Sequence, residues 1–89
     1  MENFKIDKFK YNELKYFCRQ YPEWKRKGIE CEKREMIEKS AIEADPETHS
    51  LLIENVTEGI PYEYMAVPRG RRQFYNKRRK FFYILSKKR

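Results

Sequence analysis

The sequence predicts an all-α protein, a compact bundle of four to five short helices that ends in a helix-turn-helix-like pair with a long basic C-terminal helix. Three observations support this fold class. Apolar residues recur at spacings of three and four in several stretches, as in amphipathic helices. Prolines and glycines fall between these stretches, where helices start and stop. After Gly70 the chain has no proline or glycine and interleaves aromatic with basic residues, so one long helix can continue to its end.

The length allows one small domain. A chain of 89 residues buries only about 60–65% of its unfolded surface, and its aromatic content of 16% supplies the large side chains that close such a core. We therefore expect a single domain over residues 1–89. Within it, residues 1–10 are expected to form an extended or frayed arm, residues 11–59 a helical scaffold, and residues 60–89 a helix-turn-helix-like basic module.

The first predicted helix covers residues 11–20. Leu14, Phe17 and Cys18 share one of its faces, and Asn12 is a candidate N-cap. The segment PEWKRK that follows predicts a second short helix, because a proline fits the first helical position. Gly28 then favours a break or a bend.

Two further helices are predicted in the scaffold. Residues 29–44 combine a narrow apolar stripe with a face of mixed charge, typical of a helix with a solvated side. The triplet Asp45-Pro46-Glu47 predicts the next start, with aspartate as N-cap and proline at the first helical position. Gly59 is placed to end this helix in the left-handed conformation.

The cysteines and the single histidine point to structural roles. Cys18 and Cys31 are interpreted as small buried hydrophobes, and His49 as a helix-surface residue, because no second histidine or cysteine stands near it at ligand spacing. The chain shows neither a secretory signal nor a run of about 20 apolar residues. We expect a cytoplasmic protein with reduced thiols, with no metal, no cofactor and no membrane partner.

Charge is distributed unevenly along the chain. The whole carries 21 basic and 14 acidic residues, a formal charge of +7, but residues 66–89 hold ten basic residues and no acidic one. Residues 1–65 therefore hold 11 basic and 14 acidic residues, a charge of −3. A cationic end on a mildly acidic body indicates a nucleic acid or another polyanion as partner. A solvated basic tail without a partner is the alternative.

The long C-terminal helix is predicted from about Arg69 to Leu85, roughly 18 residues and 27 Å. At 100° per residue, Phe74, Phe81 and Leu85 fall on one side. The opposite arc carries side chains of the types that contact phosphates and base edges. With the basic residues at both ends of the helix, the candidate nucleic-acid-binding residues are Arg69, Arg71, Arg72, Gln73, Asn76, Lys77, Arg79, Lys80, Tyr83, Lys87, Lys88 and Arg89.

Two features of this helix need interpretation. Arg78 falls in the middle of the apolar arc, so we expect it to extend to the surface or to meet a carboxylate, with Glu54, Glu58 and Glu63 as candidates. The aromatic residues at helical spacing are interpreted as core rather than as a platform for single-stranded bases. Tyr83, on the polar arc, is the aromatic residue expected to contact nucleic acid.

The segments YNELKYFCRQYPEWK, IEKSAIEADPETHSLLIENVTEGIPYEYM and VPRGRRQFYNKRRKFFYILSKKR together resemble small proteins of phages and mobile elements of Gram-positive bacteria. More distantly, the C-terminal part is similar to the sigma-factor region-four helix-turn-helix of phage late-transcription regulators of the ArpU and RinA type. The resemblance implies that residues 60–65 form a first helix and that residues 69–85 read DNA. The chain is shorter than that pattern between Met65 and Pro68 and lacks the usual glycine of the turn.

Three classes of function follow. The first is a DNA-binding protein of a phage or mobile element, a transcription regulator with double-stranded DNA as partner, for which a homodimer would add specificity. The second is a small phage-encoded inhibitor of the anti-CRISPR type that uses the same helix on a nucleic-acid-handling enzyme or its RNA. An acidic protein surface or anionic lipid is a further alternative for a basic helix. The third class, an enzyme, is poorly supported, because the sequence has no phosphate loop, no metal cluster and no pair of nucleophile and base.

Overall fold

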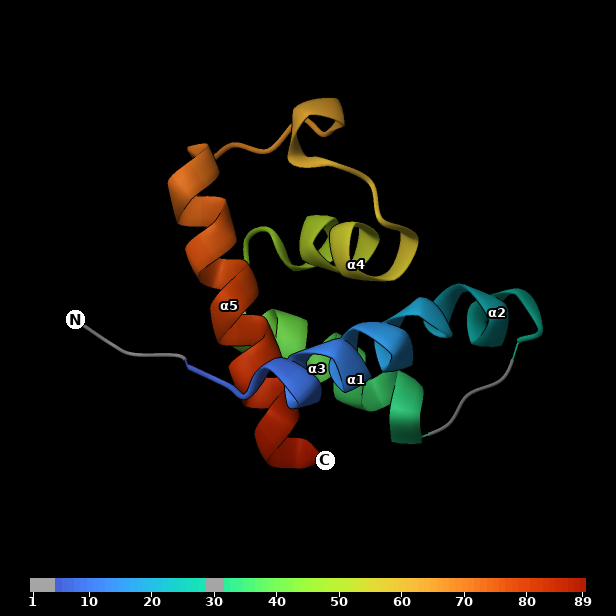
Figure 1. Cartoon of the computed structure of the whole chain (residues 1–89). Coiled ribbons are helices and arrows are strands. Elements are labelled where there is room, and N and C mark those ends of the chain that lie inside the picture. The colour runs from blue at the N-terminus through green and yellow to red at the C-terminus, as the bar shows by residue number, and fades with distance from the viewer. Residues whose placement is uncertain (1–4, 29–31) are drawn as a thin grey trace.

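The computed structural model describes residues 5–28 and 32–89, which form helices joined by short connections (Figure 1). In chain order the elements are α1 (Lys8–Arg19), α2 (Tyr21–Arg26), α3 (Glu32–Ala44), α4 (His49–Glu58), the 3-10 helix η1 (Tyr62–Tyr64) and α5 (Arg71–Lys88). No strand occurs in the described residues. The prediction of a small all-α bundle with a long basic C-terminal helix is confirmed.

The core lies where α5 packs against α3 and α1. α5 makes its most extensive contact with α3, and α1 crosses α5 while also packing on α4 (Figure 1). Phe74, Phe81, Phe82 and Leu85 supply the buried face of α5. On the other helices, the buried apolar side chains are Leu14, Phe17, Cys18, Tyr21, Ile37, Ala41, Ala44, Leu52 and Val56.

The first helix begins earlier than its apolar pattern predicts. Asp7 is the N-cap, and its carboxylate accepts a hydrogen bond from the Phe9 N–H at 2.7 Å. The prediction of Asn12 as cap is therefore wrong, and residues 8–10 are helical instead of an extended arm. Phe9 is exposed, so this first turn buries no apolar residue that would have marked it in the sequence.

Two glycines with positive φ end helices of the scaffold. Gly28 follows α2 with φ of +69°, and Gly59 follows α4 with φ of +71°. The Gly59 N–H donates to the Asn55 carbonyl at 3.1 Å, which satisfies a carbonyl of the last turn. The predicted break at Gly28 and the predicted stop at Gly59 are both confirmed. The start of the helix predicted over residues 29–44, and with it Cys31, lies outside the described residues.

The fourth helix starts three residues after the position that the sequence predicts. Residues 46–48 form a turn, and α4 begins at His49 with Thr48 as its N-cap residue. The Asp45 side chain instead organises the turn, because it accepts hydrogen bonds from the Glu47 N–H at 3.3 Å and the Thr48 hydroxyl at 2.6 Å. The aspartate is thus a turn residue, and its prediction as N-cap of a helix starting at Pro46 is wrong.

The segment expected to form the first helix of the C-terminal pair is a single 3-10 turn. It covers three residues, Tyr62–Tyr64, and is flanked by extended backbone at Pro61 and Met65. α5 follows as one uninterrupted helix of 18 residues. It begins two residues after the predicted start at Arg69 and continues three residues past Leu85.

Candidate nucleic-acid interface

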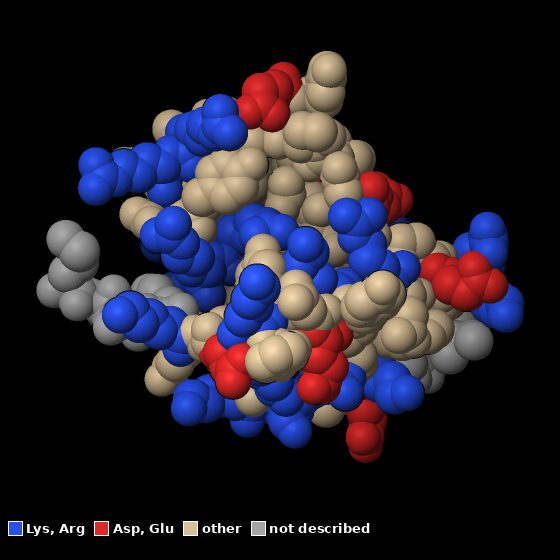
Figure 2. Space-filling model, in the orientation of Figure 1, with Lys and Arg blue, Asp and Glu red and all other residues tan. Residues whose placement is uncertain are grey.

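The outer face of α5 is a continuous basic surface. Its inner face holds the buried aromatic residues and Leu85, so the remaining arc points away from α3 and α1. Figure 2 shows Lys and Arg side chains gathered over α5 on the face in view. The residues of the outer arc are Arg72, Gln73, Asn76, Lys77, Arg79, Lys80, Tyr83 and Lys87. These eight residues are called the outer face of α5 below. All of them belong to the set of candidate nucleic-acid-binding residues that the sequence predicts.

None of the five Lys and Arg side chains of this outer face forms an ion pair among the described residues. The contacts within the face are local ones. The Arg79 guanidinium donates to the Asn76 side-chain oxygen Oδ1 at 3.4 Å, and the Lys87 ammonium lies 5.1 Å from the centroid of the Tyr83 ring. The cations Arg72, Lys77, Arg79, Lys80 and Lys87 therefore face solvent without neutralisation by a carboxylate.

Three other predicted residues are ion-paired with the rest of the chain. Arg71 meets Glu63 of η1 at 3.1 Å. At the C-terminal end, Lys88 pairs with Glu43 of α3 at 2.9 Å and Arg89 with Glu13 of α1 at 3.2 Å. The last two contacts hold the end of α5 against the scaffold, so the structure does not place these side chains with the outer face.

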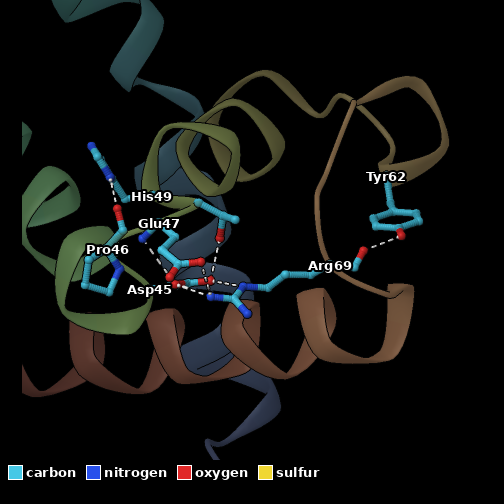
Figure 3. A network of polar contacts seen from close by, with 7 residues as sticks. Asp45, Pro46, Glu47, His49, Tyr62 and Arg69 are labelled. Carbon is cyan, nitrogen blue, oxygen red and sulfur yellow. Dashed lines mark hydrogen bonds and ion pairs between the residues drawn. The ribbon is translucent and has the colours of Figure 1, made fainter.

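Arg69, another of the predicted residues, pairs with two carboxylates, those of Asp45 and Glu47 (Figure 3). Its guanidinium donates two hydrogen bonds to the Asp45 carboxylate, from Nε to Oδ2 at 2.6 Å and from Nη2 to Oδ1 at 3.0 Å. Asp45 is only 2% exposed. Nη2 also reaches Glu47 at 3.1 Å. Such a bidentate pair fixes the side chain in orientation as well as position, so Arg69 anchors the segment before α5 to the turn before α4.

The Asp45 carboxyl is held in its ionised form by this arrangement. Burial raises the pKa of Asp45, but the hydrogen bonds from Arg69, Thr48 and the Glu47 N–H outweigh it, so the pKa lies below its usual value of 3.8. In the same contact, the hydrogen bond that Arg69 donates to Asp45 raises the pKa of Arg69. The pair is therefore fully charged at neutral pH.

The approach to α5 is fixed at a second point. The Tyr62 hydroxyl donates to the Arg69 carbonyl at 2.7 Å, and the Tyr62 ring packs 5.6 Å from the Phe74 ring. The segment thus reaches Gly70 in a defined position. Gly70 offers no side chain to cap α5, and the first turn of α5 contains Arg71 and Arg72 but no acidic residue. These charges oppose the positive end of the helix dipole.

Among the described residues Arg78 meets no carboxylate, and the prediction of Glu54, Glu58 or Glu63 as partner is wrong. Its Nε donates to the Asn55 side-chain oxygen at 2.7 Å and its Nη1 to the Tyr11 hydroxyl at 2.7 Å. The guanidinium also lies 5.0 Å from the centroid of the Phe82 ring. Two neutral acceptors and an aromatic face thus stabilise the half-buried cation.

Basic side chains on α1, which the charge count of the C-terminal third left out, lie close to this arginine. The Lys15 ammonium is 5.5 Å from the centroid of the Tyr11 ring, and Arg19 lies against Gly59 at the end of α4. Burial raises the pKa of the Cys18 thiol to about 12, while the charges of Arg78, Arg89 and Arg19 act in the opposite direction. No local sequence signal marked this group, because Arg78 is brought near the two α1 side chains only through the packing of α1 on α5.

The described residues contain no group of three or more His, Cys, Asp or Glu side chains that could hold a metal ion. His49 stands at the start of α4, where a ring nitrogen lies 2.8 Å from the Pro46 carbonyl. Among the helices described, none is both long enough and apolar enough to cross a membrane.

A second helix pair in the fold has the turn length of a helix-turn-helix. α3 and α4 are joined by the four residues 45–48. However, α4 has no lysine or arginine, and its exposed side chains include Glu54 and Glu58. An acidic helix is repelled by a phosphate backbone, so α4 is unsuited to reading DNA. Of the two helices considered, only α5 carries the charge that such a role requires.

Comparisons with protein-family models, with curated proteins and with solved structures find no match for this chain. Its resemblance to phage regulators therefore stays an expectation from the sequence.

Proposed function

We propose that the protein binds double-stranded DNA and lays the outer face of α5 in the major groove, as a transcription regulator of a phage or mobile element would. One observation carries the proposal. α5 is an uninterrupted helix of 18 residues with five cations on its outer face, none of them ion-paired in the described structure. The major groove, about 12 Å wide, admits an α-helix.

The contacts of α5 divide the proposed roles among its residues. Arg69 and Arg71 are occupied by carboxylates, so the side chains available for base edges near the start of the helix are Arg72, Gln73 and Asn76. These types suit guanine and adenine. The remaining cations of the outer face, Lys77, Arg79, Lys80 and Lys87, would contact phosphates and position the helix.

The start of α5 supports an anionic partner. Two arginines at the positive end of the helix dipole weaken the helix by themselves, and no side chain caps it. Phosphate groups would reverse the sign of this interaction, because they are attracted both to the arginines and to the free N–H groups of the first turn.

The test is a salt titration of duplex binding by the wild type and the double variant Lys77→Gln/Lys80→Gln, which removes two of the proposed phosphate contacts. Each lost phosphate contact lowers the slope of log K against log salt by about 1. We expect the double variant to bind more weakly and with a slope reduced by about 2. The matched control is Lys25→Gln/Lys39→Gln, which removes two exposed and unpaired charges from α2 and α3. Equal slopes for the double variant and this control would exclude α5 as the binding surface.

Sequence recognition is tested separately. A duplex from upstream of the protein's own operon is compared with a scrambled duplex at about 150 mM salt, where specific sites bind at least a thousandfold tighter in typical cases. Gln73→Ala/Asn76→Ala is expected to remove this preference while leaving the salt slope unchanged. If both duplexes bind alike, the helix is a general cation, and an RNA or a protein target of an inhibitor becomes the better explanation.

A further inference from the structure

Three basic side chains without a carboxylate partner in the described residues lie along the region where α1 packs on α5 and on the end of α4. They are Lys15, Arg19 and Arg78, and none forms an ion pair within the part of the chain described. Figure 2 shows that Lys and Arg side chains continue from α5 across the middle of the molecular face. This group is called the α1–α5 cluster below.

Tyr11 and Asn55 fix the position of this cluster. The Tyr11 ring has the Lys15 ammonium 5.5 Å and the Arg78 guanidinium 5.9 Å from its centroid. Asn55 accepts from Arg78 Nε and donates from its amide to the Ile60 carbonyl at 2.9 Å. Arg78 is therefore held rigidly by two neighbouring elements, and its Nη2 has no hydrogen-bond partner among the described residues.

Arg19 is held by the end of α4. Its guanidinium occupies the space that a side chain at Gly59 would need, since a Cβ built there would lie 2.6 Å from Nη1. The same glycine is hydrogen-bonded to the Asn55 carbonyl. The end of α4 thus contacts both cations. The Asn55 side chain accepts a hydrogen bond from Arg78, and Gly59 lies against the Arg19 guanidinium.

A surface hollow of about 320 Å³ adjoins this cluster on α1, lined by Asn12, Lys15, Tyr16 and Arg19. Tyr16 is 76% exposed. An amide, a phenol, an ammonium and a guanidinium are all hydrogen-bond donors to phosphate oxygens. Among the described residues, no acidic side chain lines the hollow.

We propose that the α1–α5 cluster is a site for a phosphate group, and that this phosphate belongs to the backbone of the same duplex that α5 holds. The proposal rests on the proposed function and extends its interface from α5 to α1. A half-buried guanidinium without a counter-ion is costly, and cation–π contacts offset only part of that cost. A phosphate oxygen would supply the missing opposite charge, and partial burial makes this attraction stronger than in bulk water.

The experiment compares Lys15→Gln/Arg19→Gln with the control Lys25→Gln/Lys39→Gln in the same duplex salt titration. Arg78 itself is left intact because its removal would disturb the core. Loss of the phosphate site is expected to weaken duplex binding roughly tenfold and to reduce the salt slope by about 1 relative to the control. Thermal melting of both variants checks that neither is unfolded.

A second arm uses inorganic phosphate and follows the Arg78 Nε–H resonance by NMR. If the wild type binds the duplex and the α1 variant matches the control, the phosphate site is excluded while the proposed function stands. If the wild type binds no duplex, the proposed function fails. In that case, a resonance shift on adding phosphate that is lost in the α1 variant identifies a site for a free phosphate ligand, and the absence of any shift overturns the proposal.

Discussion

At the scale of single residues, Asp45 makes two separate contributions to the structure. Its carboxylate orders the turn before α4 and anchors Arg69, so it links two segments that are 24 positions apart in the chain. We expect Asp45→Asn to lower the melting temperature by several degrees, because the amide cannot accept both hydrogen bonds of the guanidinium fork. Glu47→Gln is the control, since Glu47 is exposed and makes a single contact with Arg69. Similar melting temperatures for both variants would show that the contact adds no stability.

The same carboxylate makes stability depend on pH in the acid range. Because the folded pKa of Asp45 lies below 3.8, the unfolded chain binds the proton more tightly. The stabilisation is therefore complete above the unfolded pKa and is lost as the pH falls through the lower, folded one. Unfolding curves between pH 6 and about 2 should show a smaller loss of stability for Asp45→Asn than for the wild type. An identical acid dependence of the two proteins would contradict this linkage.

Asn55 gives a second prediction at this scale. It is 9% exposed, accepts from Arg78 and donates to the Ile60 carbonyl. Asn55→Ala should lower the free energy of unfolding by about 2 kcal/mol, because it leaves a half-buried guanidinium nitrogen and a carbonyl without partners. Glu54→Ala, at the exposed neighbouring position, should change it by less than about 0.5 kcal/mol. Urea unfolding of the two variants makes the comparison.

The sequence predicted which side chains of α5 lie on its polar side, but it could not predict the residues that they contact. Arg78 was correctly recognised as a cation on the apolar arc, yet its acceptors are the Asn55 amide and the Tyr11 hydroxyl. Tyr11 is 67 positions away from Arg78, and nothing in a local pattern indicates such a pairing. Arg69 was predicted at the start of the helix but lies two residues before it, and its bidentate pair with Asp45 depends on the tertiary fold.

At the scale of elements, α5 was the most predictable part of the chain, because no proline or glycine interrupts it and its buried apolar residues recur from Phe74 to Leu85. The shorter elements were harder to place. α4 and α1 differ from expectation at their starts, where side-chain hydrogen bonds of Asp45 and Asp7 decide the boundary. The turn η1 is shorter than the expected helix, since extended backbone at Pro61 and Met65 confines it to three residues.

The start of α5 allows stability and binding to be changed in opposite directions. Gly70 has φ of −63° and ψ of 155°, and a Cβ there would meet nothing within 4 Å. Gly70→Asp should therefore cap the helix and stabilise the protein by roughly 0.5–1 kcal/mol. Its negative charge should at the same time weaken duplex binding. Gly70→Ser is the control, a cap without charge that should retain affinity. Equal affinities of the two variants would show that DNA does not approach this end.

At the scale of the whole molecule, Cys18 reports on the integrity of the core. Cys18 belongs to α1 and is fully buried against the neighbouring helices, and this burial raises the pKa of its thiol to about 12. The folded protein should therefore not react with thiol reagents. In a Cys31→Ser background, labelling should be at least about a thousandfold slower than in denaturant, given the stability typical of small domains. Rapid labelling in buffer would mean that α1 separates from the bundle without global unfolding.

The outer face of α5 also has a consequence for how copies of the protein meet. Two molecules approaching through these faces would bring like charges together, and the repulsion would keep that encounter short. A polyanion lying between them removes the repulsion and supplies a common counter-ion. Molecules that repel one another in free solution would then be able to bind close together along one nucleic acid. Their local density would therefore depend on the presence of the nucleic acid.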